Sequence, residues 1–102
     1  MRTYSLSFDP YRSMHVGDQL LAFVKDNRYV VSWSRPYDGL YLLKSEYDFG
    51  TILNSFKSFF GINISFFLSE VSHNASGGIL QQDVWNWFNQ GYLPNFLPSS
   101  DK

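Results

Sequence analysis

Polar and apolar residues alternate in two stretches of the chain. Residues 3–8 (TYSLSF) alternate threonine or serine with larger apolar side chains, and residues 62–71 repeat this pattern. A period of two is typical of strands with one face buried, so we expect a strand in each stretch. Phe67 breaks the second alternation because it falls on the polar side. The first strand ends at Asp9, which precedes a proline and therefore favours a turn.

Other stretches have apolar residues at helical spacing. Residues 14–26 have this spacing, and residues 49–60 have it most clearly, with apolar positions at i, i+3, i+4, i+7, i+10 and i+11. Such a wide apolar stripe is typical of a helix that faces a core. Asp48 is a favourable N-terminal cap for the second helix, and Gly61 is a typical C-terminal stop. A shorter helix is predicted over residues 83–90 (DVWNWFNQ).

The remaining pattern predicts a hairpin. Residues 28–34 and 40–45 are rich in β-branched and aromatic side chains, and the turn-forming sequence RPYDG lies between them.

The order strand, helix, strand, strand, helix, strand predicts an α+β, ferredoxin-like sandwich: a four-stranded antiparallel sheet with two helices on one face, plus a short C-terminal helix. We expect residues 1–91 to form a single domain and residues 92–102 to form a loosely ordered tail.

The composition is consistent with a Phe-rich core or with aromatic rings that a second subunit covers. Aromatic residues make up 20% of the chain, and charged residues make up 17%, below the roughly 25% of an average domain. Interface cores are enriched in rings and depleted in charge, which favours a homodimer. The candidate interface residues are Phe67 and Trp87, the latter lying off the apolar face of its predicted helix. The plainer alternative for such a ring is local cover within its own subunit.

Charge and cysteine content limit the other partners. Eight basic and nine acidic residues give a net charge of −1, and the basic residues do not form a run. RNA contacts are therefore expected to be weak, because phosphate contacts supply most nucleic-acid affinity. The absence of cysteine excludes disulfides and thiolate metal sites. No signal-peptide pattern or membrane-spanning apolar run is found, so we expect a cytoplasmic protein with no membrane partner.

Asp9 is the candidate catalytic and metal-binding residue. A carboxylate at the end of the first strand could face its own copy across a two-fold axis, where the pair would bind Mg²⁺ or share a proton. Alternatively, Asp9 accepts hydrogen bonds from the amides of the turn that follows it. His15 and His73 are interpreted as ordinary solvated residues. No other cofactor is indicated.

Three segments are similar to a known family. The segments SFDPYR, YLLKS and ILQQDVWNWFNQ resemble those of the SinR-family proteins, small bacterial proteins related to the CRISPR-associated endoribonuclease-like group, which includes VapD-type toxins and the GhoS antitoxin. The resemblance spans roughly residues 3–89 and implies a ferredoxin-like fold and, usually, a homodimer. In the nuclease members the aspartate that ends the first strand is metal-associated, and Asp9 matches that position. Those nucleases have polar and basic residues after the aspartate, whereas Pro10 follows it here.

Two functions are consistent with these features. The first is a small, cytoplasmic, dimeric protein without catalytic activity that acts through protein or weak RNA contacts in a toxin–antitoxin or defence setting. The second is a Mg²⁺-dependent endoribonuclease that uses Asp9. A third class, a small-molecule sensor, has no sequence motif behind it.

Overall fold

The computed structural model describes residues 1–10, 16–62 and 64–90. The chain divides into two compact units, residues 1–71 and residues 72–102. His15 and the predicted tail over residues 92–102 lie outside the described residues. The expectation of one domain over residues 1–91 stays a prediction. No helix among the described residues is long and apolar enough to cross a membrane.

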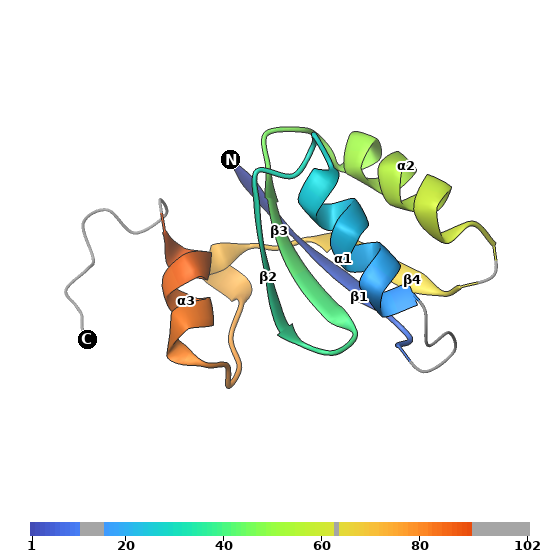
Figure 1. The fold of residues 1–102 in the computed structure, drawn as a ribbon. Helices are drawn as coiled ribbons and strands as arrows, with labels where there is room; N and C mark the ends of the chain where they lie inside the picture. Colours follow the sequence, from blue (N-terminus) through green and yellow to red (C-terminus); the bar gives the residue numbers. More distant parts are fainter. Residues whose placement is uncertain (11–15, 63, 91–102) are drawn as a thin grey trace. The chain divides into compact units, whose positions relative to one another are not determined.

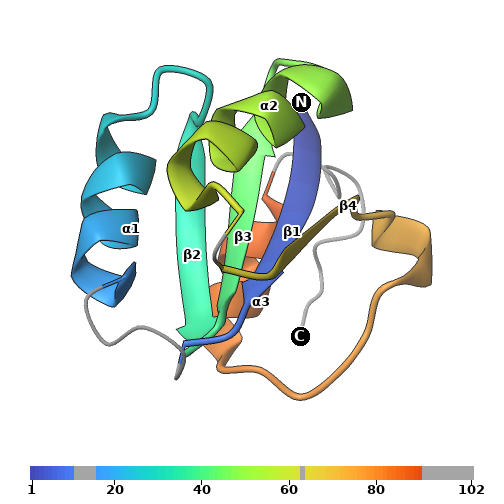
Figure 2. The same ribbon diagram turned by 90° about the vertical axis from the view of Figure 1, so that its right-hand side faces the viewer.

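The described part of the first unit is a four-stranded sheet with two helices on one face (Figures 1 and 2). The strands stand in the order β2-β3-β1-β4, and all neighbours are antiparallel. This arrangement confirms the predicted α+β, ferredoxin-like fold. The elements are β1 Arg2–Phe8, α1 Val16–Asp26, β2 Ser32–Tyr37, β3 Leu40–Ser45, α2 Phe49–Phe60 and β4 Phe66–Glu70.

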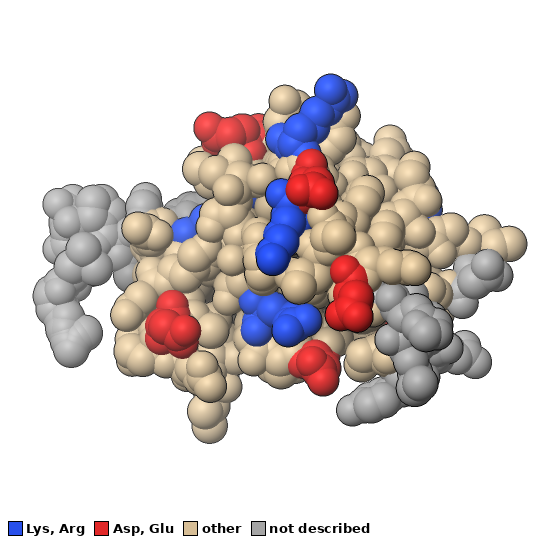
Figure 3. All heavy atoms as spheres, in the orientation of Figure 1, with Lys and Arg blue, Asp and Glu red and all other residues tan. Residues whose placement is uncertain are grey.

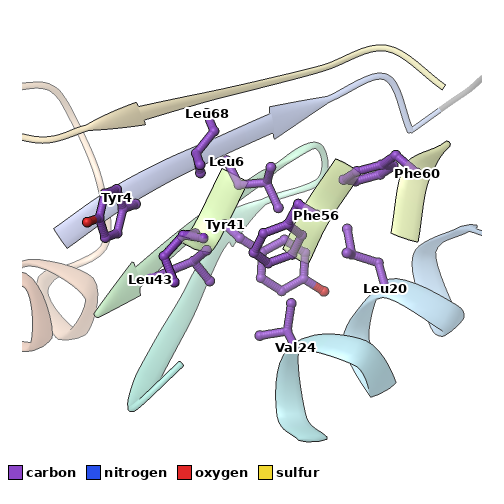
Figure 4. Packing of buried hydrophobic residues seen from close by; sticks show 10 residues of the cluster. Tyr4, Leu6, Leu20, Val24, Tyr41, Leu43, Phe56, Phe60 and Leu68 are labelled. Carbon is purple, nitrogen blue, oxygen red and sulfur yellow. The ribbon is translucent and has the colours of Figure 1, made fainter. Parts of the chain in front are cut away.

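The core lies between the helices and the central strands. In the β1–β3 pair, Tyr4 stands opposite Leu43 and Leu6 opposite Tyr41, and all four side chains are buried. Burying a large apolar side chain contributes roughly 1.5–3 kcal/mol, so this face must be covered. The residues that complete the cluster come from α1, α2 and β4 (Figure 4): Leu20, Val24, Ile52, Phe56, Phe60 and Leu68.

The ends of α2 are fixed as the sequence predicts. The Asp48 carboxylate accepts a hydrogen bond of 2.9 Å from the Thr51 amide, and its contacts with the Thr51 side chain and backbone lower the pKa of Asp48. At the other end, Gly61 adopts φ 64°, in the left-handed region that favours glycine. Its amide donates to the Lys57 carbonyl oxygen at 2.9 Å. Both the cap and the stop are confirmed.

Strand β2 begins later than predicted, at Ser32 rather than at residue 28. The Asn27 side chain accepts a hydrogen bond from the Tyr29 amide and donates one to Ser55 Oγ, both at 2.9 Å. Such side-chain bonds compete with strand pairing and hold the start of this segment in a turn. The predicted strand start at residue 28 was therefore wrong.

The β2–β3 turn is also shorter than predicted. Strand β2 continues through Pro36 to Tyr37, with a register shift before Tyr37, and leaves only Asp38 and Gly39 as the turn. Proline lacks a ladder donor but is tolerated at the irregular part of an edge strand. Gly39 has φ 89°. Its carbonyl oxygen accepts a hydrogen bond of 3.0 Å from the amide of Phe8, which joins the end of β1 to the turn.

Strand β4 covers only part of the predicted segment over residues 62–71. It begins at Phe66, whose partner is Phe8, the last residue of β1. Earlier residues have no β1 residue to pair with, because the chain leaves the sheet after Phe8. Ile62, predicted on the buried side, is 99% exposed.

The described part of the second unit contains a short 3₁₀ helix, η1 His73–Ala75, and α3 Gln82–Asn89. The imidazole of His73 lies 4.1 Å from the ring of Phe88 and stacks on it, and its Nε2 is 3.0 Å from the Phe88 carbonyl oxygen. Val84 and Phe88 are buried, as their predicted shared face requires. The interpretation of His73 as an ordinary solvated residue was therefore wrong. Its partner lies fifteen residues away in the sequence, so no neighbouring residue indicated the contact.

Replacing Gly39 tests the junction between β1 and the hairpin. A Cβ atom at Gly39 would lie 3.0 Å from the Phe8 carbonyl oxygen, and its φ disfavours L side chains. We expect Gly39→Ala to lower the free energy of unfolding by more than about 1 kcal/mol. Gly50→Ala in α2 is the matched control, since a Cβ there meets nothing within 4 Å. Urea denaturation should show Gly50→Ala unchanged or stabilised by up to about 1 kcal/mol; equal effects of the two variants would contradict this account.

Candidate functional site

Asp9 lies where the sequence predicts, directly after the last residue of β1, and its side chain is exposed. The hydrogen bond between the Phe8 amide and Gly39 places it beside the β2–β3 turn. Among the described residues, no three His, Cys, Asp or Glu side chains are grouped so that they could hold a metal ion.

Phe67 lies on the sheet face that points away from the helices. It stands opposite Ser7 on β1, and its side chain is 68% exposed. Next to this pair, the hydroxyls of Ser5 and Ser69 are 2.9 Å apart and form a hydrogen bond across the same two strands. The ring is therefore an exposed apolar group beside small polar ones, on a strand at the edge of the sheet.

Trp87 lies in α3 and is half-buried. In the same helix, Trp85 makes an edge-to-face contact with Phe88, with ring centroids 5.6 Å apart. The interface role predicted for Trp87 stays a prediction.

A pocket near Asp9 brings together residues that are distant in the sequence. It lies at the end of β1, between the β2–β3 hairpin and the first turn of α1, and has a volume of about 150 Å³. Asp9 is not among its lining residues, although both neighbours of Asp9 are. The lining residues are Phe8, Pro10, Gly17, Arg35, Asp38, Gly39 and Tyr41.

Tyr41 gives the pocket a buried polar group. The residue is 1% exposed, and its hydroxyl has no hydrogen-bond partner among the described residues. By contrast, the hydroxyl of Tyr4, on the same side of the sheet, donates to the Tyr47 carbonyl oxygen at 2.8 Å. A buried hydroxyl without a partner costs roughly 1–3 kcal/mol, so the environment of Tyr41 is unusual.

Two charged side chains of opposite sign line the same pocket. Burial raises the pKa of the Tyr41 phenol, and Asp38 adds to this rise. The charge of the nearby Arg35 guanidinium and its contact with the phenol oppose the rise, although the two groups do not meet in hydrogen-bond geometry. The Tyr41 hydroxyl therefore remains protonated at neutral pH and can donate a hydrogen bond. Arg35 and Asp38 are both exposed, and neither forms a salt bridge with another described residue. The pocket thus offers a hydroxyl donor, a cation and an anion.

A second hollow is less informative. It has a volume of about 470 Å³ and lies between the end of α1 and α2. Two of its lining polar groups already have protein partners, since Ser55 accepts from Asn27 and Tyr29 accepts from Arg28. The pocket at Tyr41 is therefore the stronger candidate for a binding site.

The face shown in Figure 3 does not favour strong nucleic-acid binding. On the face shown in Figure 3, the side chains of Lys and Arg are interspersed with those of Asp and Glu. A mixed distribution of this kind provides little of the clustered positive charge on which phosphate binding depends.

Comparisons with known proteins do not assign this chain to a family. No protein-family model matches the chain, and neither a curated protein nor a solved structure matches it significantly. The resemblance to the SinR family therefore stays a prediction.

Proposed function

We propose that this chain is a homodimeric binding protein of the cytoplasm, without catalytic activity, that acts through protein or weak RNA contacts in a toxin–antitoxin or defence setting. The observation that carries the dimer is Phe67, which is exposed on an edge strand of the sheet. The toxin–antitoxin or defence setting is inferred only from the resemblance to the SinR family.

The edge position of β4 supports pairing with a second copy. Within the described residues, β4 pairs with β1 alone, so its outer edge can receive another strand. Two copies of β4 could pair in antiparallel fashion about a two-fold axis perpendicular to the sheet. Both Phe67 rings would then lie on the same face of one continuous sheet and could cover each other. Burying each ring would contribute roughly 1.5–3 kcal/mol to association.

Substitution of Phe67 tests this arrangement. We expect the wild-type protein to sediment as a dimer and Phe67→Ser to weaken the dimer at least about tenfold, because two rings lose their cover. Ile62→Ser is the matched control: Ile62 is an exposed apolar residue outside β4 and should not affect association. Analytical ultracentrifugation at micromolar concentration measures the effect. Only an 11.9 kDa species for the wild type would overturn the dimer, and dissociation by Ile62→Ser alone would overturn the role of Phe67.

A Mg²⁺-dependent endoribonuclease is the second candidate function. The observation that favours it is the exposure of Asp9 at the end of β1, where a metal ion and an RNA phosphate could reach it. A metal held there would activate water or stabilise the charge that develops on the phosphate.

An RNA-cleavage assay separates the two functions. Purified wild type, Asp9→Ala and Asp26→Ala are incubated with RNA and Mg²⁺; Asp26 is an exposed carboxylate at the end of α1 and is the matched control. The non-catalytic function predicts no cleavage by any of the three proteins. Cleavage that Asp9→Ala removes and Asp26→Ala preserves would contradict the non-catalytic function. Cleavage that survives Asp9→Ala would exclude the Asp9 mechanism.

A further inference from the structure

The first turn of α1 leaves a hollow above Tyr41. Gly17, Leu20 and Val24 follow one another at i, i+3 and i+7 and so lie on one face of the helix. Leu20 and Val24 are buried against the sheet, whereas Gly17 lines the pocket and a Cβ there would meet nothing within 4 Å. Figure 4 shows the Tyr41 ring projecting from β3 toward α1. The missing side chain of Gly17 therefore keeps space open near the Tyr41 ring.

The Tyr41 hydroxyl makes this space unlike an ordinary packing defect. An apolar side chain of similar shape would avoid the cost of burying a hydroxyl without a protein partner. Tyr41 is 1% exposed, and its hydroxyl group has no hydrogen-bond partner among the described residues. A ligand with an acceptor group would offset that cost.

Arg35 and Asp38 indicate what kind of ligand fits. Both line the pocket and influence the pKa of Tyr41, but they do not form a salt bridge with each other. A simple anion would be attracted to Arg35 and repelled by Asp38. A simple cation would be attracted to Asp38 and repelled by Arg35. A molecule that carries both charges can satisfy both side chains at once, because each charge then has an oppositely charged neighbour.

We propose that this pocket binds a small zwitterion with one carboxylate and one ammonium group, which is the chemistry of a small α-amino acid. The carboxylate accepts hydrogen bonds from the Arg35 guanidinium and the Tyr41 hydroxyl, and the ammonium group donates to Asp38. Phe8 and Pro10 provide the apolar wall for the carbon atoms of the ligand. This site is separate from the β4 edge and does not depend on the dimer.

The volume of the pocket limits the size of the ligand. Drug-sized ligands occupy pockets of roughly 300–1,000 Å³, whereas a cavity of roughly 150 Å³ in another protein holds benzene. The pocket at Tyr41 measures about 150 Å³. Glycine, alanine and serine have a comparable number of non-hydrogen atoms, so they are the appropriate probes.

Titration of the ¹⁵N-labelled protein, followed by NMR, tests the proposal. We expect glycine, L-alanine or L-serine to shift the amide signals of Gly17 and Gly39 in a saturable manner. Propionate and ethylamine, which each carry only one of the two charges, should bind at least about tenfold more weakly. Arg35→Gln and Tyr41→Phe should each weaken binding by a similar factor, and Gly17→Leu should abolish it by filling the space. Arg28→Gln is the matched control, because Arg28 bonds to Tyr29 outside this pocket.

Each alternative outcome has a definite meaning. No saturable shift with any of the three amino acids would overturn the proposal. Equal binding of propionate or inorganic phosphate would show a simple anion site and would overturn the zwitterion. Binding that survives both Arg35→Gln and Tyr41→Phe would place the ligand elsewhere. The amide spectra of the variants report whether they remain folded, and both substitutions are conservative in shape.

Discussion

The rest of the structure depends on the need to cover one face of the two central strands. The β1–β3 register sets Tyr4 opposite Leu43 and Leu6 opposite Tyr41, which gives a continuous buried surface across the middle of the sheet. Helices α1 and α2 supply the apolar side chains that cover it. A one-residue slip would turn this surface to the other face, so the hydrophobic pattern fixes the register. The same register brings Tyr41 beneath the first turn of α1 and leaves Asp9 at the end of β1, beside the hairpin turn.

The sequence predicted most accurately the elements whose signals are local. Strand β3 and helix α2 have the predicted bounds, because alternation, the Asp48 cap and the Gly61 stop act within a few residues. The edge strands were less well predicted, for two physical reasons. The start of β2 depends on hydrogen bonds from Asn27, one of which reaches Ser55 on α2. The start of β4 depends on where its neighbour β1 ends, which the sequence of β4 itself does not contain.

The candidate site could be predicted only in part. The position of Asp9 at the end of the first strand followed from alternation and the proline after it. The pocket could not be predicted, because Phe8, Gly17 and Arg35 come together through the sheet order and the packing of α1. Alternation places Tyr41 on the inner face, but only the arrangement in space shows that its hydroxyl lacks a protein partner. The contact of His73 with Phe88 was missed for the same reason, since no local pattern indicates it.

The central claim concerns the two buried tyrosine hydroxyls on the inner face of the sheet: that of Tyr4 supports the fold, and that of Tyr41 does not. The matched variants are Tyr4→Phe and Tyr41→Phe, which remove the same atom from two buried tyrosines. The free energy of unfolding in urea, measured without added ligand, tests the claim directly. We predict that Tyr4→Phe loses about 1 kcal/mol, because Tyr47 loses its donor, and that Tyr41→Phe gains about 1 kcal/mol. A loss of stability in Tyr41→Phe equal to that in Tyr4→Phe would contradict the claim.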